Sequence, residues 1–96
     1  MLIQLEKFGS TLTSRPAGKD AYAGFSSVLD GVLDDELVEV DFRGVSSLSP
    51  SWGDEFLTPL LEKFGKRLIL LNTENQSVSM TIELLEETGG HKFIVR

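Results

Sequence analysis

The sequence predicts one small α/β domain with the order β-α-β-α-β-α-β, in which three helices join four strands of a mostly parallel or mixed sheet. Strand-like apolar patterns alternate with helix-like ones along the whole chain, and this alternation is typical of α/β folds. Capping residues or glycines stand at the ends of the helix-like segments. At 96 residues the chain can bury one hydrophobic core but not two. We therefore treat residues 1–96 as a single domain.

The first strand and the first helix are expected in the N-terminal third of the chain. Residues 2–8 form a short mixed apolar run that favours a strand, and residues 9–11 end it with turn-forming side chains. Residues 14–16, Ser-Arg-Pro, begin a helix that ends at Gly31 or at the acidic pair 34–35. The apolar residues at helical spacing are Tyr22, Phe25, Leu29 and Val32.

The second strand and the second helix follow one another closely. Residues 37–42 predict the strand, because apolar and acidic side chains alternate there with a period of two. Ser49 and Pro50 then fit an N-cap and a first helical residue, since the N–H that proline lacks could not be paired in the first turn. Pro59 is expected to bend this helix, and Gly65 to end it in a left-handed conformation. Its apolar face comprises Trp52, Phe56, Leu57, Leu60, Leu61 and Phe64.

The remaining elements are a buried strand, a third helix and a short last strand. Residues 68–71 form a continuous apolar run, as expected for a strand near the middle of the sheet. Asn75 can cap the third helix, residues 89–90 end it with two glycines, and residues 93–95 form the last strand. The predicted core consists of Phe25, Leu29, Val38, Val40, Phe42, Phe56, Leu60, Phe64, Ile69, Leu71, Ile82 and Leu85.

Composition and charge argue against several classes of function. The chain has no cysteine, which excludes disulfides, thiolate catalysis and cysteine zinc sites. His91 is the single histidine, so a histidine-rich metal site is excluded and we assign it no role. A formal net charge of −6 opposes binding to nucleic acid or to anionic membranes. No apolar run reaches the roughly 18 residues of a membrane span, and no signal-peptide pattern begins the chain. We expect a cytoplasmic protein without a metal or cofactor.

Polar side chains are concentrated where the second strand turns into the second helix. Parallel strands bring their carboxyl ends to one edge of a sheet, so Asn72, which follows the third strand, should lie beside this turn. Ligands of α/β folds bind at such edges. We therefore predict a partner-binding surface here. Its residues are Arg43, Ser46, Ser47, Ser51, Trp52, Asp54 and Asn72.

These residues also have structural interpretations. Serines at a helix start are favoured as caps over a phosphorylation cluster, and Ser51 with Asp54 fits a capping box in outline. Trp52 lies on the apolar stripe of the helix, so core packing is favoured over a partner contact. Asp54 and Glu55 are favoured as first-turn acids, and Glu55 as a structural partner of Arg15.

Two other classes of function remain open. A small enzyme would use Asp41, Asp54 or Glu55, but the sequence offers no nucleophile with a neighbouring base. A nucleotide or anion binder would use the N-terminus of the second helix, where Gly44 and Gly53 are isolated and form no phosphate loop. We expect a non-enzymatic protein with no catalytic residues.

Several short segments carry a family resemblance. The main ones are residues 41–45 (DFRGV) and residues 51–56 (SWGDEF), with further matches at residues 8–9, 14–15 and 68–72. In this order and spacing they resemble the bacterial STAS-like domains related to anti-sigma factor antagonists. The resemblance covers nearly the whole chain and implies a small cytoplasmic regulatory module that binds protein partners. Such a partner is often an ATPase-type serine kinase or a regulatory assembly, and some members are phosphorylated on serine.

The sequence departs from the antagonists at the residue that takes the phosphate. Their Asp-Ser-Ser-Gly run corresponds here to residues 49–52, Ser-Pro-Ser-Trp, which places Pro50 at the acceptor position. Ser51 matches the second serine of that run and is favoured for phosphorylation over Ser49, whose hydroxyl is expected to cap the helix. The pair Asp54 and Glu55 resembles the branch of STAS-like domains whose activity is largely uncharacterised.

Overall fold

The computed structural model describes residues 1–96 and has the predicted α/β architecture. The strands are β1 (Leu2–Gln4), β2 (Thr11–Leu12), β3 (Val38–Asp41), β4 (Ser47–Leu48), β5 (Leu68–Leu71) and β6 (Ile94–Val95). The helices are α1 (Arg15–Leu29), α2 (Pro50–Phe64) and α3 (Gln76–Gly89), and 3-10 turns cover Leu5–Phe8 and Gly65–Arg67. The four-stranded sheet has the order β1-β3-β5-β6, and all of its pairs are parallel. β5 is therefore an inner strand, as its apolar run predicts.

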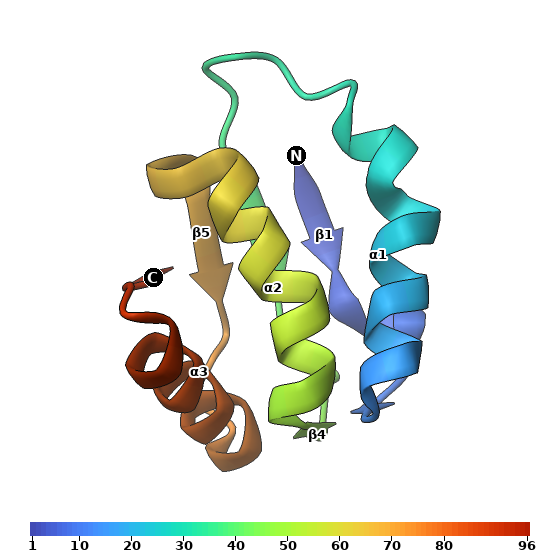
Figure 1. The fold of residues 1–96 in the computed structure, drawn as a ribbon, viewed down its shortest axis with the longest axis vertical. Coiled ribbons are helices and arrows are strands. Elements are labelled where there is room, and N and C mark those ends of the chain that lie inside the picture. Colours follow the sequence, from blue (N-terminus) through green and yellow to red (C-terminus); the bar gives the residue numbers. More distant parts are fainter.

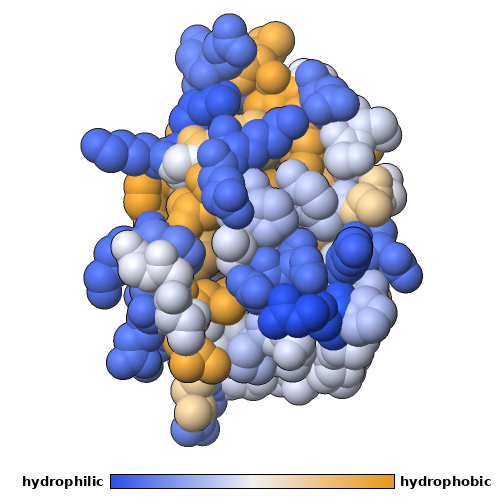
Figure 2. Space-filling view, in the orientation of Figure 1, coloured by the Kyte–Doolittle hydropathy of each residue, from blue (hydrophilic) through white to orange (hydrophobic).

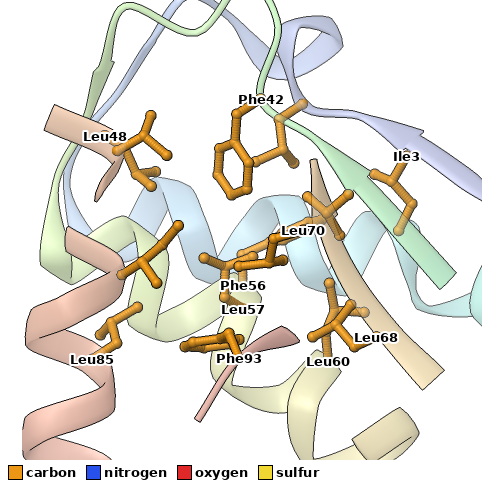
Figure 3. Close-up of a cluster of buried hydrophobic side chains, with 14 of the residues drawn as sticks. Ile3, Phe42, Leu48, Phe56, Leu57, Leu60, Leu68, Leu70, Leu85 and Phe93 are labelled. Atoms are coloured by element: carbon orange, nitrogen blue, oxygen red, sulfur yellow. The ribbon is translucent and has the colours of Figure 1, made fainter. Parts of the chain in front are cut away.

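α2 is the central helix of the domain. It lies in front of the sheet with α1 on one side and α3 on the other, and both helices pack against it (Figure 1). Between α2 and the sheet, the side chains of Phe56, Leu57 and Leu60 meet those of Leu68 and Leu70 (Figure 3). These five residues are all buried. The broad apolar face of α2 is thus the part of the helix that faces the sheet.

Three side-chain caps determine where the helices begin. Ser14, Ser49 and Asn75 each accept a hydrogen bond from the backbone N–H three residues later, at 3.3, 3.1 and 3.1 Å. Each bond satisfies an N–H that has no partner within its helix. The predicted caps Ser49 and Asn75 are confirmed, and the capping box of Ser51 with Asp54 is wrong because Ser49 holds that cap.

Some local features differ from the sequence prediction. Residues 2–8 are not one strand, because β1 ends at Gln4 and the 3-10 turn that follows buries Leu5. β2 and β4 pair with each other in parallel, and two-residue strands are too short to show an alternating pattern. Leu71 and Phe25 are half-buried rather than in the core. Leu71 aligns with Asp41 on the sheet face away from the helices.

The sheet face away from the helices is partly apolar. Leu2, Glu39, Ile69 and Ile94 align across the four strands on this face. Ile69 is buried but stands outside the main core cluster, and Leu2 and Ile94 are exposed. Parallel sheets usually have both faces covered. In this domain the three helices lie on the opposite face (Figure 1). The face that carries Leu2 and Ile94 is therefore an exposed surface, and a test of partner binding has to distinguish it from the surface formed by the helices.

Two glycines allow the three helices to approach one another closely. A Cβ at Gly18 of α1 would lie 2.6 Å from the carbonyl oxygen and 2.9 Å from the Cα of Trp52. A Cβ at Gly53 of α2 would lie 3.1 Å from Thr81 Cγ2 and 3.2 Å from Leu85 Cδ1, both on α3. The contact at Gly18 is with backbone, which cannot move aside as the end of a side chain can. Gly18 therefore fixes the distance between α1 and α2.

Gly18→Ala should destabilise the domain by about 1 to 3 kcal/mol, because the added methyl group overlaps the backbone of α2. Gly24→Ala in the same helix is the matched control, since its added Cβ would meet no atom within 4 Å beyond its chain neighbours and the backbone of its own helix. The control should stabilise the domain by about 0.5 to 1 kcal/mol, because alanine favours a helix more than glycine does. Urea denaturation of both variants measures the free energy of unfolding. Equal changes in the two variants would contradict the close approach of α1 to α2 at Gly18.

Candidate functional site

Asp41 joins the carboxyl ends of β3 and β5. Its Oδ1 accepts hydrogen bonds from the backbone N–H of Arg43 at 2.9 Å and from Nδ2 of Asn72 at 2.8 Å. Asn72 has a positive φ of 56°, which asparagine tolerates better than most residues. The parallel register thus brings Arg43 and Asn72 to one edge of the sheet, and the side chain of Arg43 is exposed there.

Ser46 and Ser47 are tied to the residue before β2. The backbone carbonyl of Ser10 accepts hydrogen bonds from the N–H of Ser46 at 2.8 Å and from the N–H of Ser47 at 3.1 Å. The hydroxyl of Ser46 donates to the same carbonyl at 3.0 Å. Nδ2 of Asn75 donates to the carbonyl of Ser46 at 3.2 Å. These two serines therefore hold the turn between β3 and α2 in place.

Hydroxyl side chains fasten α3 to β4. The N–H of Leu48 donates to Oγ of Ser77 at 3.0 Å, and the carbonyl of Leu48 accepts a hydrogen bond from Oγ1 of Thr81 at 2.7 Å. Thr81 is buried, with an exposed fraction of 3%. Because both backbone groups of Leu48 are bonded, α3 is held at a fixed position beside the start of α2.

The first turn of α2 has few free hydrogen-bond donors. Pro50 has no N–H, the N–H of Trp52 donates to Oγ of Ser49, and the N–H of Gly53 donates to the carbonyl of Ser49 at 2.9 Å. The N–H and the hydroxyl of Ser51 have no hydrogen-bond partner within the protein. Ser51 is half-buried. Of the two serines that flank Pro50, only Ser51 thus has a free hydroxyl.

Arg15 at the start of α1 bridges two acids of α2. Its Nη1 lies 2.9 Å from Oδ2 of Asp54 and 3.3 Å from Oε1 of Glu55. The predicted structural pair of Arg15 with Glu55 is present, and Asp54 is the closer partner. The guanidinium of Arg15 lowers the pKa of Asp54, and the hydroxyl of Thr58, which donates to Asp54 at 2.9 Å, lowers it further. The two carboxylates in turn raise the pKa of Arg15.

Trp52 is not a surface residue, so its prediction as a partner contact is wrong. Its exposed fraction is 2%. The indole stacks on Phe56 with 5.0 Å between ring centroids and lies 6.1 Å from the ring of Phe8. α1 crosses directly over the backbone of Trp52 at Gly18, which explains its burial in the first turn. The favoured interpretation of Trp52 as a core residue is confirmed.

An open groove lies between the start of α2 and the exposed side of α3. Its volume is about 450 Å³. Met80 and Leu84 have exposed fractions of 60% and 41%, and Pro50 is exposed on the opposite wall. We call this depression the α2–α3 groove. Its lining residues are Leu48, Pro50, Ser77, Met80, Thr81, Glu83, Leu84 and Glu87.

A second depression of about 320 Å³ continues the surface toward α1. It shares Pro50 and Leu84 with the α2–α3 groove and is also lined by Arg15, Ser51 and Asp54. Figure 2 shows strongly hydrophilic surface over the lower ends of α1 and α2, with apolar surface beside it over α3. Polar and apolar groups therefore adjoin at the start of α2.

The structure divides the predicted binding residues into separate groups. Ser51 and Asp54 border the groove, whereas Arg43 and Asn72 gather around Asp41, and no hydrogen bond or ion pair links the two groups. Met80 and Leu84, which line the groove, are not among the residues predicted from the sequence. They are four residues apart and lie off the buried stripe of α3, which consists of Val78, Thr81, Ile82 and Leu85. That second apolar row is the signal that would have revealed the groove.

The structure also bears on metal binding, on membrane crossing and on the surroundings of His91. No group of three or more histidine, cysteine, aspartate or glutamate side chains is arranged to hold a metal ion. None of the helices combines the length and the apolar character needed to cross a membrane. His91 packs edge-on against Phe93, and its Nδ1 is buried without a hydrogen-bond partner.

Comparison with known proteins identifies the family. The model of a STAS-like domain of unknown function (DUF4325) matches residues 26–78, which is more than half of the chain. The match runs from the last turn of α1 to the start of α3 and includes β3, the serine-rich turn and all of α2. The chain therefore belongs to this family of STAS-like domains. No curated protein and no solved structure matches it.

Arg15→Met should raise the pKa of Asp54 toward the ordinary aspartate value of about 3.9, because its main electrostatic partner is lost. The lowered pKa of Asp54 stabilises the fold above that ordinary value, and this contribution disappears as the pH falls through the lower folded-state pKa. The side chains of Arg15 and Asp54 are about half exposed, so solvent screens the pair and the effect on stability at neutral pH should be small. NMR titration of the Asp54 carboxyl measures the shift.

Arg43→Met is the control for this titration, since it removes an exposed arginine that does not contact Asp54. An unchanged Asp54 pKa in the Arg15 variant, or an equal rise in the Arg43 variant, would show that the ion pair does not control Asp54.

Proposed function

We propose that this STAS-like domain is a non-enzymatic regulatory module of the bacterial cytoplasm that binds a protein partner. The binding surface consists of the start of α2 and the α2–α3 groove. One observation carries the proposal: an exposed apolar groove directly adjoins a helix start whose serine hydroxyl is free. Adjacent apolar and modifiable polar groups suit an interaction that is both specific and regulated.

The exposed apolar residues of the groove support protein binding. Single exposed apolar side chains are common on any protein, whereas a grouped patch is typical of an interaction site. Met80, Leu84 and Pro50 form such a group around one depression. Their neighbours on α3 and β4 are fixed by the hydrogen bonds of Leu48. A partner would therefore bind a preformed surface, at little cost in conformational entropy.

The rival functions have weaker support from the same geometry. A nucleotide or anion at the N-terminus of α2 would find one free N–H, that of Ser51, because Ser49 and Pro50 account for the others. An enzyme would need a carboxylate available for chemistry. Asp54 and Glu55 are paired with Arg15, and Asp41 accepts two hydrogen bonds at the sheet edge.

Ser51 is the residue that we propose for regulation by phosphorylation. Its hydroxyl is free, whereas the hydroxyl of Ser49 caps α2. A phosphate on Ser51 would lie at the positive end of the α2 dipole and beside Arg15, which lines the same depression. It would also repel Asp54. Phosphorylation would thus change the charge directly next to the groove.

A binding assay with the ATPase-type kinase encoded nearest to the gene of this chain tests both parts of the proposal. Leu84→Lys and Met80→Lys should each weaken binding at least about ten-fold, because a charge replaces an apolar contact at the centre of the surface. Isothermal titration calorimetry measures the affinity. Intact mass after incubation with kinase and ATP should show one added phosphate that Ser51→Ala removes.

Val28→Lys is the matched control for these variants. Val28 is 46% exposed on α1, close to the 41% of Leu84, but lies outside the groove. Its affinity should equal that of the unmodified domain, and circular dichroism should show that all three variants are folded. Unchanged affinity in both groove variants would place the binding surface elsewhere. Phosphate found only at Ser49 would overturn the choice of Ser51.

A further inference from the structure

The α2–α3 groove has a charge pattern as well as an apolar one. Met80 and Leu84 are four residues apart, and so are Glu83 and Glu87; all four side chains line the groove. Residues four apart lie on the same face of a helix. α3 therefore presents an apolar row and an acidic row that run side by side along the groove.

The acidic row is not neutralised by neighbouring cations. No lysine or arginine lines the groove. Lys92 borders the glutamates on their far side, but its Nζ lies 3.8 Å from Glu86, and its side chain is 87% exposed. Arg15, on the other flank, is already paired with Asp54 and Glu55. An approaching partner would therefore meet uncompensated negative charge beside the apolar row.

We propose that the α2–α3 groove receives an amphipathic helix of the partner, with an apolar stripe that is flanked by lysine or arginine residues. This inference rests on the proposed function and specifies the chemistry of the partner at that site. The apolar stripe would contact Met80, Leu84 and Pro50, and the basic residues would face Glu83 and Glu87. Apolar anchors spaced at i, i+4 and i+7 are the usual way for a helix to bind in a groove.

The hydrogen bonds of β4 favour a helix over an added strand. An added strand needs free backbone N–H and C=O groups at the edge that it joins. At Leu48, which lies in the groove, both groups are bonded to Ser77 and Thr81. The groove therefore offers side-chain contacts and almost no backbone ones, and these suit a helix.

The same charges oppose a second copy of this chain as the occupant. A symmetric dimer places the same patch on both sides of the interface. Glu83 and Glu87 of one copy would then approach those of the other, in a protein whose formal net charge is already −6. The negative charge of Glu83 and Glu87 attracts a basic partner and repels a second copy of this chain.

Two synthetic helical peptides with the same leucine stripe test this inference. One carries lysine and arginine beside the stripe, and its twin carries glutamate at those positions. The unmodified domain should bind the basic peptide at least about ten-fold more tightly than the acidic one, with an affinity that falls as salt is added. The double variant Glu83→Lys with Glu87→Lys should reverse this preference. Fluorescence polarisation measures the affinities.

Asp20→Lys with Asp34→Lys is the matched control, because both acids are exposed, lie outside the groove and give the same change in net charge. This control should keep the preference for the basic peptide. Leu84→Lys should weaken the binding of both peptides, because it removes an apolar contact in the groove. Equal affinity for the two peptides, no binding of the basic peptide, or a reversal in the control would overturn the inference.

The two proposals fail in different ways. If Leu84→Lys and Met80→Lys abolish binding to the kinase but the unmodified domain does not prefer the basic peptide, the proposed function stands and the basic-helix inference is wrong. If the basic peptide binds and the glutamate variants reverse its preference while the kinase does not bind, the groove chemistry stands and the choice of partner is wrong.

Discussion

The contact of Gly18 with the backbone of Trp52 is the constraint on which the arrangement of this domain depends. A Cβ at Gly18 would lie 2.6 Å from the carbonyl oxygen of Trp52, so α1 can lie at its observed distance from α2 only because residue 18 has no side chain. The crossing buries Trp52 and carries Arg15 to the carboxylates of Asp54 and Glu55. A packing contact thereby sets the electrostatics of the first turn of α2.

The opposite side of α2 is positioned by different interactions. Gly53 lets α3 approach, and the hydroxyls of Ser77 and Thr81 satisfy the backbone of Leu48. The direction of the buried stripe of α3 then leaves Met80 and Leu84 on the surface. The groove is therefore a consequence of how α3 is held, and its shape is available before any partner binds. Preformed surfaces of this kind lose little entropy on binding.

Local chemistry in the sequence is sufficient to predict the three helices and the inner strands. Ser49 before Pro50, Asn75 and the paired glycines at 89–90 act within a few residues of the helix ends that they determine. The groove depends instead on contacts between segments far apart in the chain, such as that of Leu48 with Thr81. The exposure of Met80 and Leu84 in the groove depends on which face of α3 packs against the domain, and the sequence alone does not show this. The apolar stripe of α2 already favours the burial of Trp52, but the crossing of α1 over the Trp52 backbone depends on tertiary packing that Gly18 alone does not reveal.

NMR of methyl-labelled protein is the most direct test of where the partner binds. Met80 and Leu84 have exposed methyl groups in the groove, whereas Leu2 and Ile94 have exposed methyl groups on the sheet face away from the helices. We expect addition of the ATPase-type kinase to shift or broaden the signals of Met80 and Leu84 and to leave those of Leu2 and Ile94 unchanged. Changes confined to Leu2 and Ile94 would contradict binding at the α2–α3 groove and assign the interaction to the open face of the sheet.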